Sequence, residues 1–138
     1  MTKQELREYY WTRRNIVKLE NKLAELESAA TKITTKLKLK HDQITGQGNT
    51  SDKVGNAVAE MEAVKDKISE QIKRSYVVLA EIEDVIIVLP ARESYLIRAR
   101  YVELLPWEQI AVDMKYSWKQ VHRIHAETLK LLGGEDSE

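Results

Sequence analysis

The chain of 138 residues contains no cysteine and has only two prolines and five glycines. The absence of cysteine excludes disulfides, thiolate nucleophiles and zinc–thiolate sites. The small number of helix-breaking residues, together with 32% charged residues, favours long, solvent-exposed helices over a large globular core. No apolar run approaches the roughly 18 residues that span a bilayer, and MTKQELREYY lacks the apolar centre of a signal peptide. We therefore expect a cytoplasmic protein that does not enter a membrane.

Signatures of catalysis and cofactor binding are also missing. There is no Gly-rich phosphate loop, no Ser-His-Asp ordering and no carboxylate signature for a metal. His122 and His125 are three residues apart, but no cysteine and no neighbouring carboxylate pair completes a zinc site. We expect no enzyme, no cofactor and no metal centre.

The first half of the chain carries a sustained heptad repeat. Apolar or tolerated residues recur at spacings of three and four, which predicts a long helix with one buried seam. The seam positions are Tyr9, Thr12, Ile16, Leu19, Leu23, Leu26, Ala30, Ile33, Leu37, Lys40 and Ile44.

A polar segment at about 45–52, TGQGNTSD, predicts a loop, with Ser51 or Asp52 as the cap of a second helix. Beyond it, a second seam with Lys65 and Ser75 as its polar members is expected at Val54, Val58, Met61, Lys65, Ile68, Ile72, Ser75, Leu79, Ile82, Ile86 and Leu89. A further contact face is expected from Val17, Val64, Val77, Val78, Val85, Ile87 and Val88. Residues 1–89 are thus predicted to form an antiparallel, coiled-coil-like hairpin that also serves oligomerisation.

Residues 90–134 have the pattern of a helix-turn-helix unit, and 135–138 form an acidic tail. Pro90 ends the second long helix, and a new helix is expected over about 92–103, with Tyr95, Leu96, Ala99 and Val102 buried. Leu104 and Leu105 form an elbow, and Pro106 opens a short helix over 107–114 with Ile110, Ala111 and Met114 inward. The fold class is therefore all-α, with a hairpin followed by a three-helix unit.

Ser117 is placed to cap the last helix, 118–132, which Gly133 and Gly134 end. Its buried face is expected to hold Val121, Ile124, Thr128, Leu129 and Leu132. Its outer face is expected to hold Lys119, Gln120, His122, Arg123, Ala126, Glu127 and Lys130.

The spacing of these residues resembles that of a known family of DNA-binding units. Glu108, Ile110, Ala111, Met114, Ser117, Val121, Ile124, Leu129 and Leu132 follow a pattern similar to region 4 of sigma-70-type factors, over about 40 residues. The segment YLIRARYVELLPWEQIA resembles small phage-encoded regulators of the RinA/ArpU group. The chain departs from the sigma pattern at Lys115, where many such units have glycine, and at Trp118, where a small polar or basic residue is usual. It also lacks the basic aromatic helix that melts promoters.

The resemblance implies that the last helix contacts double-stranded DNA, with Lys119 and Arg123 as base readers and Gln120 and His122 near a base edge or phosphate. Side-chain chemistry agrees, because Lys and Arg suit guanine O6 and N7 and Gln suits adenine. Trp118 is expected to stack on a sugar or a thymine methyl, or to pack inward. Arg98 and Arg100 are candidates for backbone phosphates.

Charge argues for more than one copy on the DNA. The net charge is zero, and residues 90–132 hold seven Lys or Arg against five Asp or Glu, so phosphate attraction by one copy is weak. We expect a phage or prophage transcription regulator acting as a homo-oligomer, with a dimer favoured. Two alternatives stay open: a DNA-packaging component like a small terminase subunit, and a protein that docks on RNA polymerase through its sigma-like unit.

Overall fold

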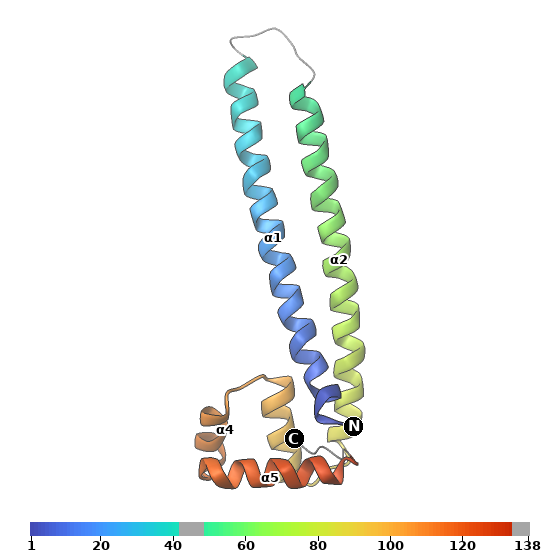
Figure 1. Cartoon of the computed structure of the whole chain (residues 1–138), viewed down its shortest axis with the longest axis vertical. Helices are drawn as coiled ribbons and strands as arrows, with labels where there is room; N and C mark the ends of the chain where they lie inside the picture. The colour runs from blue at the N-terminus through green and yellow to red at the C-terminus, as the bar shows by residue number, and fades with distance from the viewer. Residues whose placement is uncertain (42–48, 134–138) are drawn as a thin grey trace. The chain divides into compact units, whose positions relative to one another are not determined.

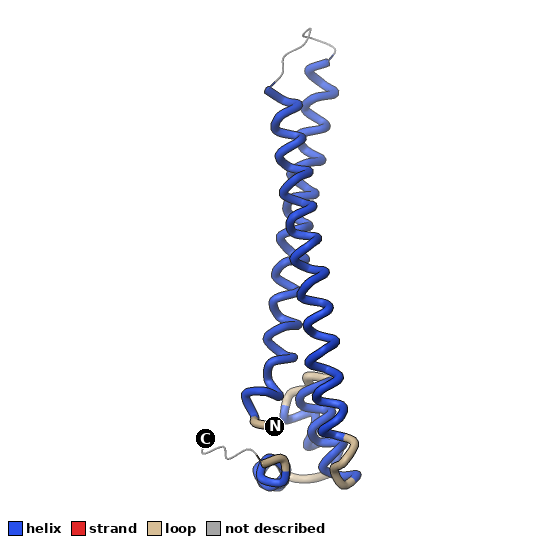
Figure 2. The backbone as a smooth tube through the Cα atoms, turned by 90° about the vertical axis from the view of Figure 1, so that its right-hand side faces the viewer, coloured by secondary structure: helices blue, strands red, loops and turns tan. Residues whose placement is uncertain are grey.

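The computed structural model describes residues 1–41 and 49–133, without the side chains at 34, 37–41 and 49–51. The described residues form helices and no strand (Figures 1 and 2). The elements are α1 (Lys3–His41), α2 (Asn49–Ile86), α3 (Ala91–Ile97), the π-helix η1 (Arg98–Val102), α4 (Trp107–Met114) and α5 (Trp118–Leu131). The long helices α1 and α2 pack together, which confirms the predicted all-α fold. None of the described helices is long and apolar enough to cross a membrane.

The loop between the long helices is shorter at its C-terminal side than predicted. α2 begins at Asn49, so positions 51 and 52 lie inside its first turn and neither is the cap. Ile44, the first part of the expected loop, Gly134 and the tail at 135–138 lie outside the described residues, as do the side chains of Leu37 and Lys40.

The chain divides into two compact units. The first comprises Met1–Arg13 and Lys73–Glu138, and the second comprises Arg14–Ile72. Within the second unit, α1 and α2 run side by side in opposite directions (Figures 1 and 2). The α1 register there is as predicted, because the shielded side chains are those of Ile16, Leu19, Leu23, Leu26, Ala30 and Ile33.

On α2, two buried side chains lie one residue before the predicted seam position. Val64 is 4% exposed, whereas Lys65, predicted to face the seam, has a side chain that is 53% exposed. Val58 is likewise 47% exposed, and Val78 is buried where Leu79 was expected. Val78 and Leu79 are both apolar, so the pattern allowed either choice there, whereas at Val64 and Lys65 the heptad count placed the polar residue in the seam. Burying the valines leaves the Lys65 ammonium hydrated, which avoids the cost of desolvating a charge.

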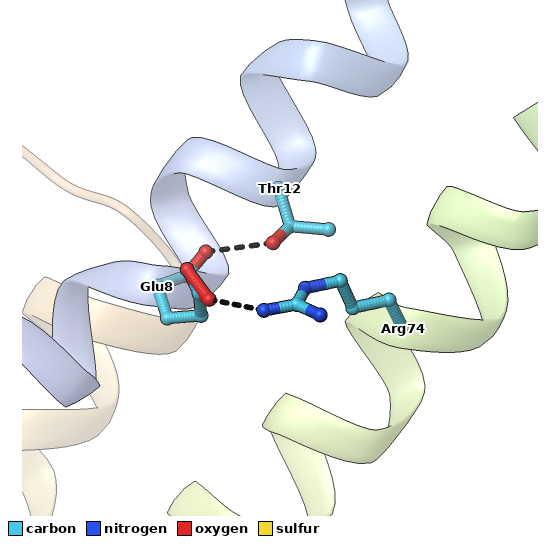
Figure 3. Close-up of polar contacts among 3 residues, drawn as sticks. All are labelled: Glu8, Thr12 and Arg74. Carbon is cyan, nitrogen blue, oxygen red and sulfur yellow. Dashed lines mark hydrogen bonds and ion pairs between the residues drawn. The ribbon is translucent and has the colours of Figure 1, made fainter. Parts of the chain in front are cut away.

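Polar residues in the seam are tolerated where the backbone satisfies them. Thr12 is 3% exposed, and its hydroxyl donates to the carbonyl oxygen of Glu8 at 2.8 Å (Figure 3). The carboxylate of Glu8 accepts from the Arg74 guanidinium at 2.6 Å, which links α1 to α2 within the first unit. Ser75 is also buried, as predicted. The start of α1 is fixed by reciprocal hydrogen bonds between Thr2 and Glu5, a capping box.

Two apolar clusters form the core of the first unit. One joins the ends of the long helices to the C-terminal helices through Leu6, Val78, Ile82, Ile86, Ile97, Tyr101 and Leu129. The other is the core of the helix-turn-helix and consists of Leu96, Ala99, Ile110, Val121 and Ile124. The ammonium group of Met1 also donates to the carbonyl oxygen of Leu132 at 2.8 Å, which ties the start of α1 to the end of α5.

The segment 91–102 differs from the expected single helix. α3 passes at Arg98 into the π-helix η1, in which the Glu103 amide donates to the Arg98 carbonyl at 2.9 Å. Tyr95 was predicted to be buried but is 48% exposed. The reason is that this segment packs against both clusters at once, so its buried face is centred on Leu96 and Ile97 and turns Tyr95 outward.

The displaced register predicts unequal effects of two similar substitutions. Val64→Ala should lower the free energy of unfolding by about 1–3 kcal/mol, because it opens a cavity in the seam. Val58→Ala should change it by less than about 0.5 kcal/mol, since alanine favours helix and this side chain is largely exposed. Urea denaturation of the two variants measures both values. Equal losses, or a larger loss at Val58, would contradict the register.

Candidate nucleic-acid interface

The predicted helix-turn-helix is present as α4, a short turn and α5. α4 is capped at its C-terminal end by Lys115, which keeps the left-handed backbone that glycine favours, with φ 60° and ψ 37°. The amides of Lys115 and Tyr116 donate to the carbonyls of Val112 and Ala111 at 3.2 and 3.1 Å. These bonds satisfy the end of α4 and reverse the chain within three residues.

Ser117 caps α5, as predicted, and does so together with Gln120. The Gln120 amide donates to the Ser117 hydroxyl at 3.2 Å, and the Ser117 amide donates to Oε1 of Gln120 at 3.1 Å. This is a complete capping box. The Gln120 side chain, expected to contact a base, is therefore also part of the helix start, and its oxygen is already used as an acceptor.

The buried face of α5 agrees with the prediction at Val121, Ile124, Thr128 and Leu129. Thr128 is fully buried, and its hydroxyl donates to the Ile124 carbonyl at 2.7 Å. The first two turns of α5 therefore have a fixed orientation. Lys119 and Arg123 are exposed on the outer face, one turn apart, and neither forms an ion pair with a carboxylate among the described residues.

His122 does not lie on the outer face, which corrects the expectation. Its imidazole packs between two indoles, with ring centroids 4.2 Å from Trp107 and 3.8 Å from Trp118. Its Nε2 is buried and has no hydrogen-bond partner in the part of the chain that is described. Trp118 contacts this imidazole and is still 57% exposed, so the rest of its indole is accessible to a ligand.

Charge as well as burial keeps His122 neutral. Removal from water lowers the pKa of His122 below its ordinary value of 6.5, and the positive charges of Arg100 and Lys3 lower it further, against a small opposing effect of Glu108. Both effects favour the neutral form of this imidazole.

Arg98 and Arg100, the two candidates for phosphate contacts, already have partners within the protein. Arg98 forms an ion pair with Glu83 of α2 at 2.5 Å. Arg100 donates to the Leu105 carbonyl at 3.0 Å, and its guanidinium lies 4.5 Å from the centre of the Trp107 ring. Arg98 thus joins η1 to α2, and Arg100 holds the elbow at Leu104 and Leu105, where Leu104 has a left-handed φ of 60°.

The pattern missed one buried polar contact. His125 is 5% exposed, and its Nε2 lies 2.6 Å from the hydroxyl of Tyr101, which is 4% exposed. The pair joins η1 to α5 inside the first unit. The spacing of His125 from Val121, Leu129 and Leu132 places it on the apolar face of α5. Helical periodicity could therefore have predicted that His125 is buried. The described residues contain no group of three or more His, Cys, Asp or Glu that could hold a metal ion.

Comparisons with known proteins give the chain no relative: no family model, no curated protein and no solved structure matches it.

The left-handed residue in the turn can be tested by relieving its strain. Lys115→Gly should raise the free energy of unfolding by about 1 kcal/mol, because glycine adopts positive φ without the clash of a Cβ atom. Lys119→Gly, inside α5, should lower it by about 1 kcal/mol. Thermal or urea denaturation of both variants measures the difference, and destabilisation by Lys115→Gly would show that the turn adopts another conformation.

The buried imidazole predicts a pH dependence. A depressed pKa means that folding favours neutral His122, so its stabilising contribution is present above the unfolded value of 6.5 and is lost as pH falls through the lower folded value. Titration of labelled histidines by NMR, with the His122 signal identified in His122→Phe, should give a midpoint below 6.5. The stability of His122→Phe should also vary less than that of the parent between about pH 7.5 and about pH 5. A midpoint at or above 6.5 would contradict the packing of this ring.

Proposed function

We propose that this protein is a sequence-specific DNA-binding transcription regulator of phage or prophage type, and that α5 enters the major groove. The observation that carries the proposal is the start of α5. A capped helix of 14 residues presents Lys119 and Arg123 on an exposed face, while its opposite face is locked into the core. Two unpaired cations one turn apart at the start of such a helix suit the O6 and N7 acceptors of guanine.

Trp118 and Gln120 have supporting roles in this proposal. The exposed indole of Trp118 offers an apolar surface beside the two cations, which suits a thymine methyl or a sugar. Gln120, held by Ser117, sets the direction in which the first turn of α5 points. The proposed contacts of Lys119 and Arg123 with bases depend on the direction of α5, because a displacement of the helix start would move both cations together.

The weak net charge requires a second copy to raise affinity. The seam residues of α1 and α2 are shielded within the chain, so a dimer has to use other surfaces. Large apolar side chains remain exposed at Tyr76 (66%), Val77 (60%), Ile87 (81%) and Val88 (77%). We propose that the dimer buries these side chains, because their burial would remove apolar area from water.

The DNA proposal has a direct experiment. Purified protein is used to select binding sequences from random double-stranded DNA, and the enriched sequence is then titrated. Lys119→Ala and Arg123→Ala should each weaken specific binding by about 1–3 kcal/mol, and the double variant should abolish discrimination between the selected and a scrambled sequence.

Lys130→Ala is the matched control, since Lys130 is an exposed cation near the other end of the same helix. This variant should change affinity by less than twofold to threefold, and all variants should keep parental helicity and mass in solution. Failure to enrich any sequence, or full binding by the double variant, would refute the assignment. A closed ring of many copies in the mass measurement would favour DNA packaging over regulation.

A further inference from the structure

A cavity of about 380 Å³ opens in the first unit, beside the helix-turn-helix and away from the outer face of α5. Its volume lies in the range of small-ligand sites. One wall comes from the first turns of α1 and the other from η1, the elbow and α5. The side chains that matter for its chemistry are those of Lys3, Arg7, Tyr10, Arg100, Trp107 and His122.

The charge around this cavity is unbalanced. Lys3, Arg7 and Arg100 line it, and no Asp or Glu does so among the described residues. Arg74, Arg92 and Arg98, in contrast, each have a carboxylate partner in the same unit. In a chain whose charges sum to zero, three cations that converge without an acid leave a site complementary to an anion.

Two of the three cations, Arg7 and Arg100, also contact aromatic rings of the protein. Lys3 and Arg7 are four residues apart on α1 and therefore share one helix face. Arg7 lies 5.5 Å from the centre of the Trp11 ring, and Arg100 is fixed by the Leu105 carbonyl and the Trp107 ring. Guanidinium groups suit the oxygens of a phosphate group, to which they donate paired hydrogen bonds.

The walls are aromatic, which narrows the class of anion. Tyr10, Trp107 and His122 line it, and removal from water lowers the pKa of the His122 imidazole. Flat rings beside clustered cations are the combination that binds a base through stacking and its phosphate through charge. The phosphate backbone of duplex DNA would use the cations but offers no unstacked base to the rings.

We propose that this cavity binds a free mononucleotide, with the phosphate at Lys3, Arg7 and Arg100 and the base against Tyr10, because the Trp107 ring already contacts Arg100 and His122. The proposal does not depend on DNA binding by α5, because the cavity and the outer face of α5 use different side chains. Its ligand is a small molecule, so binding is measurable without DNA.

The test is calorimetric titration of the full chain with AMP, GMP, CMP and UMP in separate experiments, and with inorganic phosphate. At least one mononucleotide should bind saturably, more tightly than phosphate by about tenfold or more, because stacking adds to the charge contacts. Arg7→Ala should weaken that binding by about tenfold or more. Arg13→Ala, an exposed arginine of the same helix outside the cavity, should leave it unchanged.

Three results would overturn the proposal. The first is no saturable binding of any of the four nucleotides at millimolar concentration. The second is binding that Arg7→Ala and Lys3→Ala leave intact, which would place the nucleotide elsewhere. The third is phosphate that binds as tightly as the nucleotides, which would exclude a role for the rings. If Arg7→Ala weakened only duplex DNA binding and no nucleotide bound, these cations would belong to the DNA interface and the proposal would be wrong.

Discussion

The burial of two adjacent side chains in two different apolar clusters is the constraint on which the C-terminal half of the protein depends. Leu96 packs into the helix-turn-helix core, and Ile97 packs into the cluster that includes the ends of α1 and α2. Both are fully buried. A helix that packs against two cores in this way cannot slide without opening at least one of them. The orientation of α4 and α5 within the first unit is fixed through α3 and η1, because their own core includes Leu96 and Ala99.

The π-helix that follows is consistent with the same constraint. Tyr101 lies beyond Ile97 in the first cluster and also lies within hydrogen-bond distance of His125 of α5. One wide turn at Arg98–Val102 allows Ala99 to face one cluster and Tyr101 the other. A regular α-helix has a single stripe, and the periodic pattern of the sequence was interpreted on that assumption. This is why Leu96 and Ala99 were predicted correctly as buried, whereas Ile97 and Tyr101 were not recognised and Tyr95 was placed inside.

The parts of the interface that were predicted correctly depend on local chemistry. The Ser117 cap and the bounds of α4 follow from residue types within a few positions of one another. His122 could not be placed in this way, because its environment is made by Trp107, fifteen positions earlier in the chain and on another helix. The same limit applies to α2, where the choice between Val64 and Lys65 depends on the partner helix. Helix periodicity defines a stripe, and only packing decides which edge of the stripe is buried.

The ring stack at His122 connects the two proposed sites physically. One of its neighbours, Trp107, lines the cavity, and the other, Trp118, begins α5 beside Lys119. A ligand that contacts Trp107 therefore lies two aromatic contacts from the first residue of the proposed reading helix. Thermodynamic linkage requires any effect between such sites to be reciprocal, and a ligand shifts DNA affinity only if it binds the DNA-bound conformation with a different affinity. The Ser117–Gln120 capping box and the buried face of α5 restrain the helix start, so the contacts of His122 with Trp107 and Trp118 are the route by which a ligand in the cavity could reach the outer face of α5.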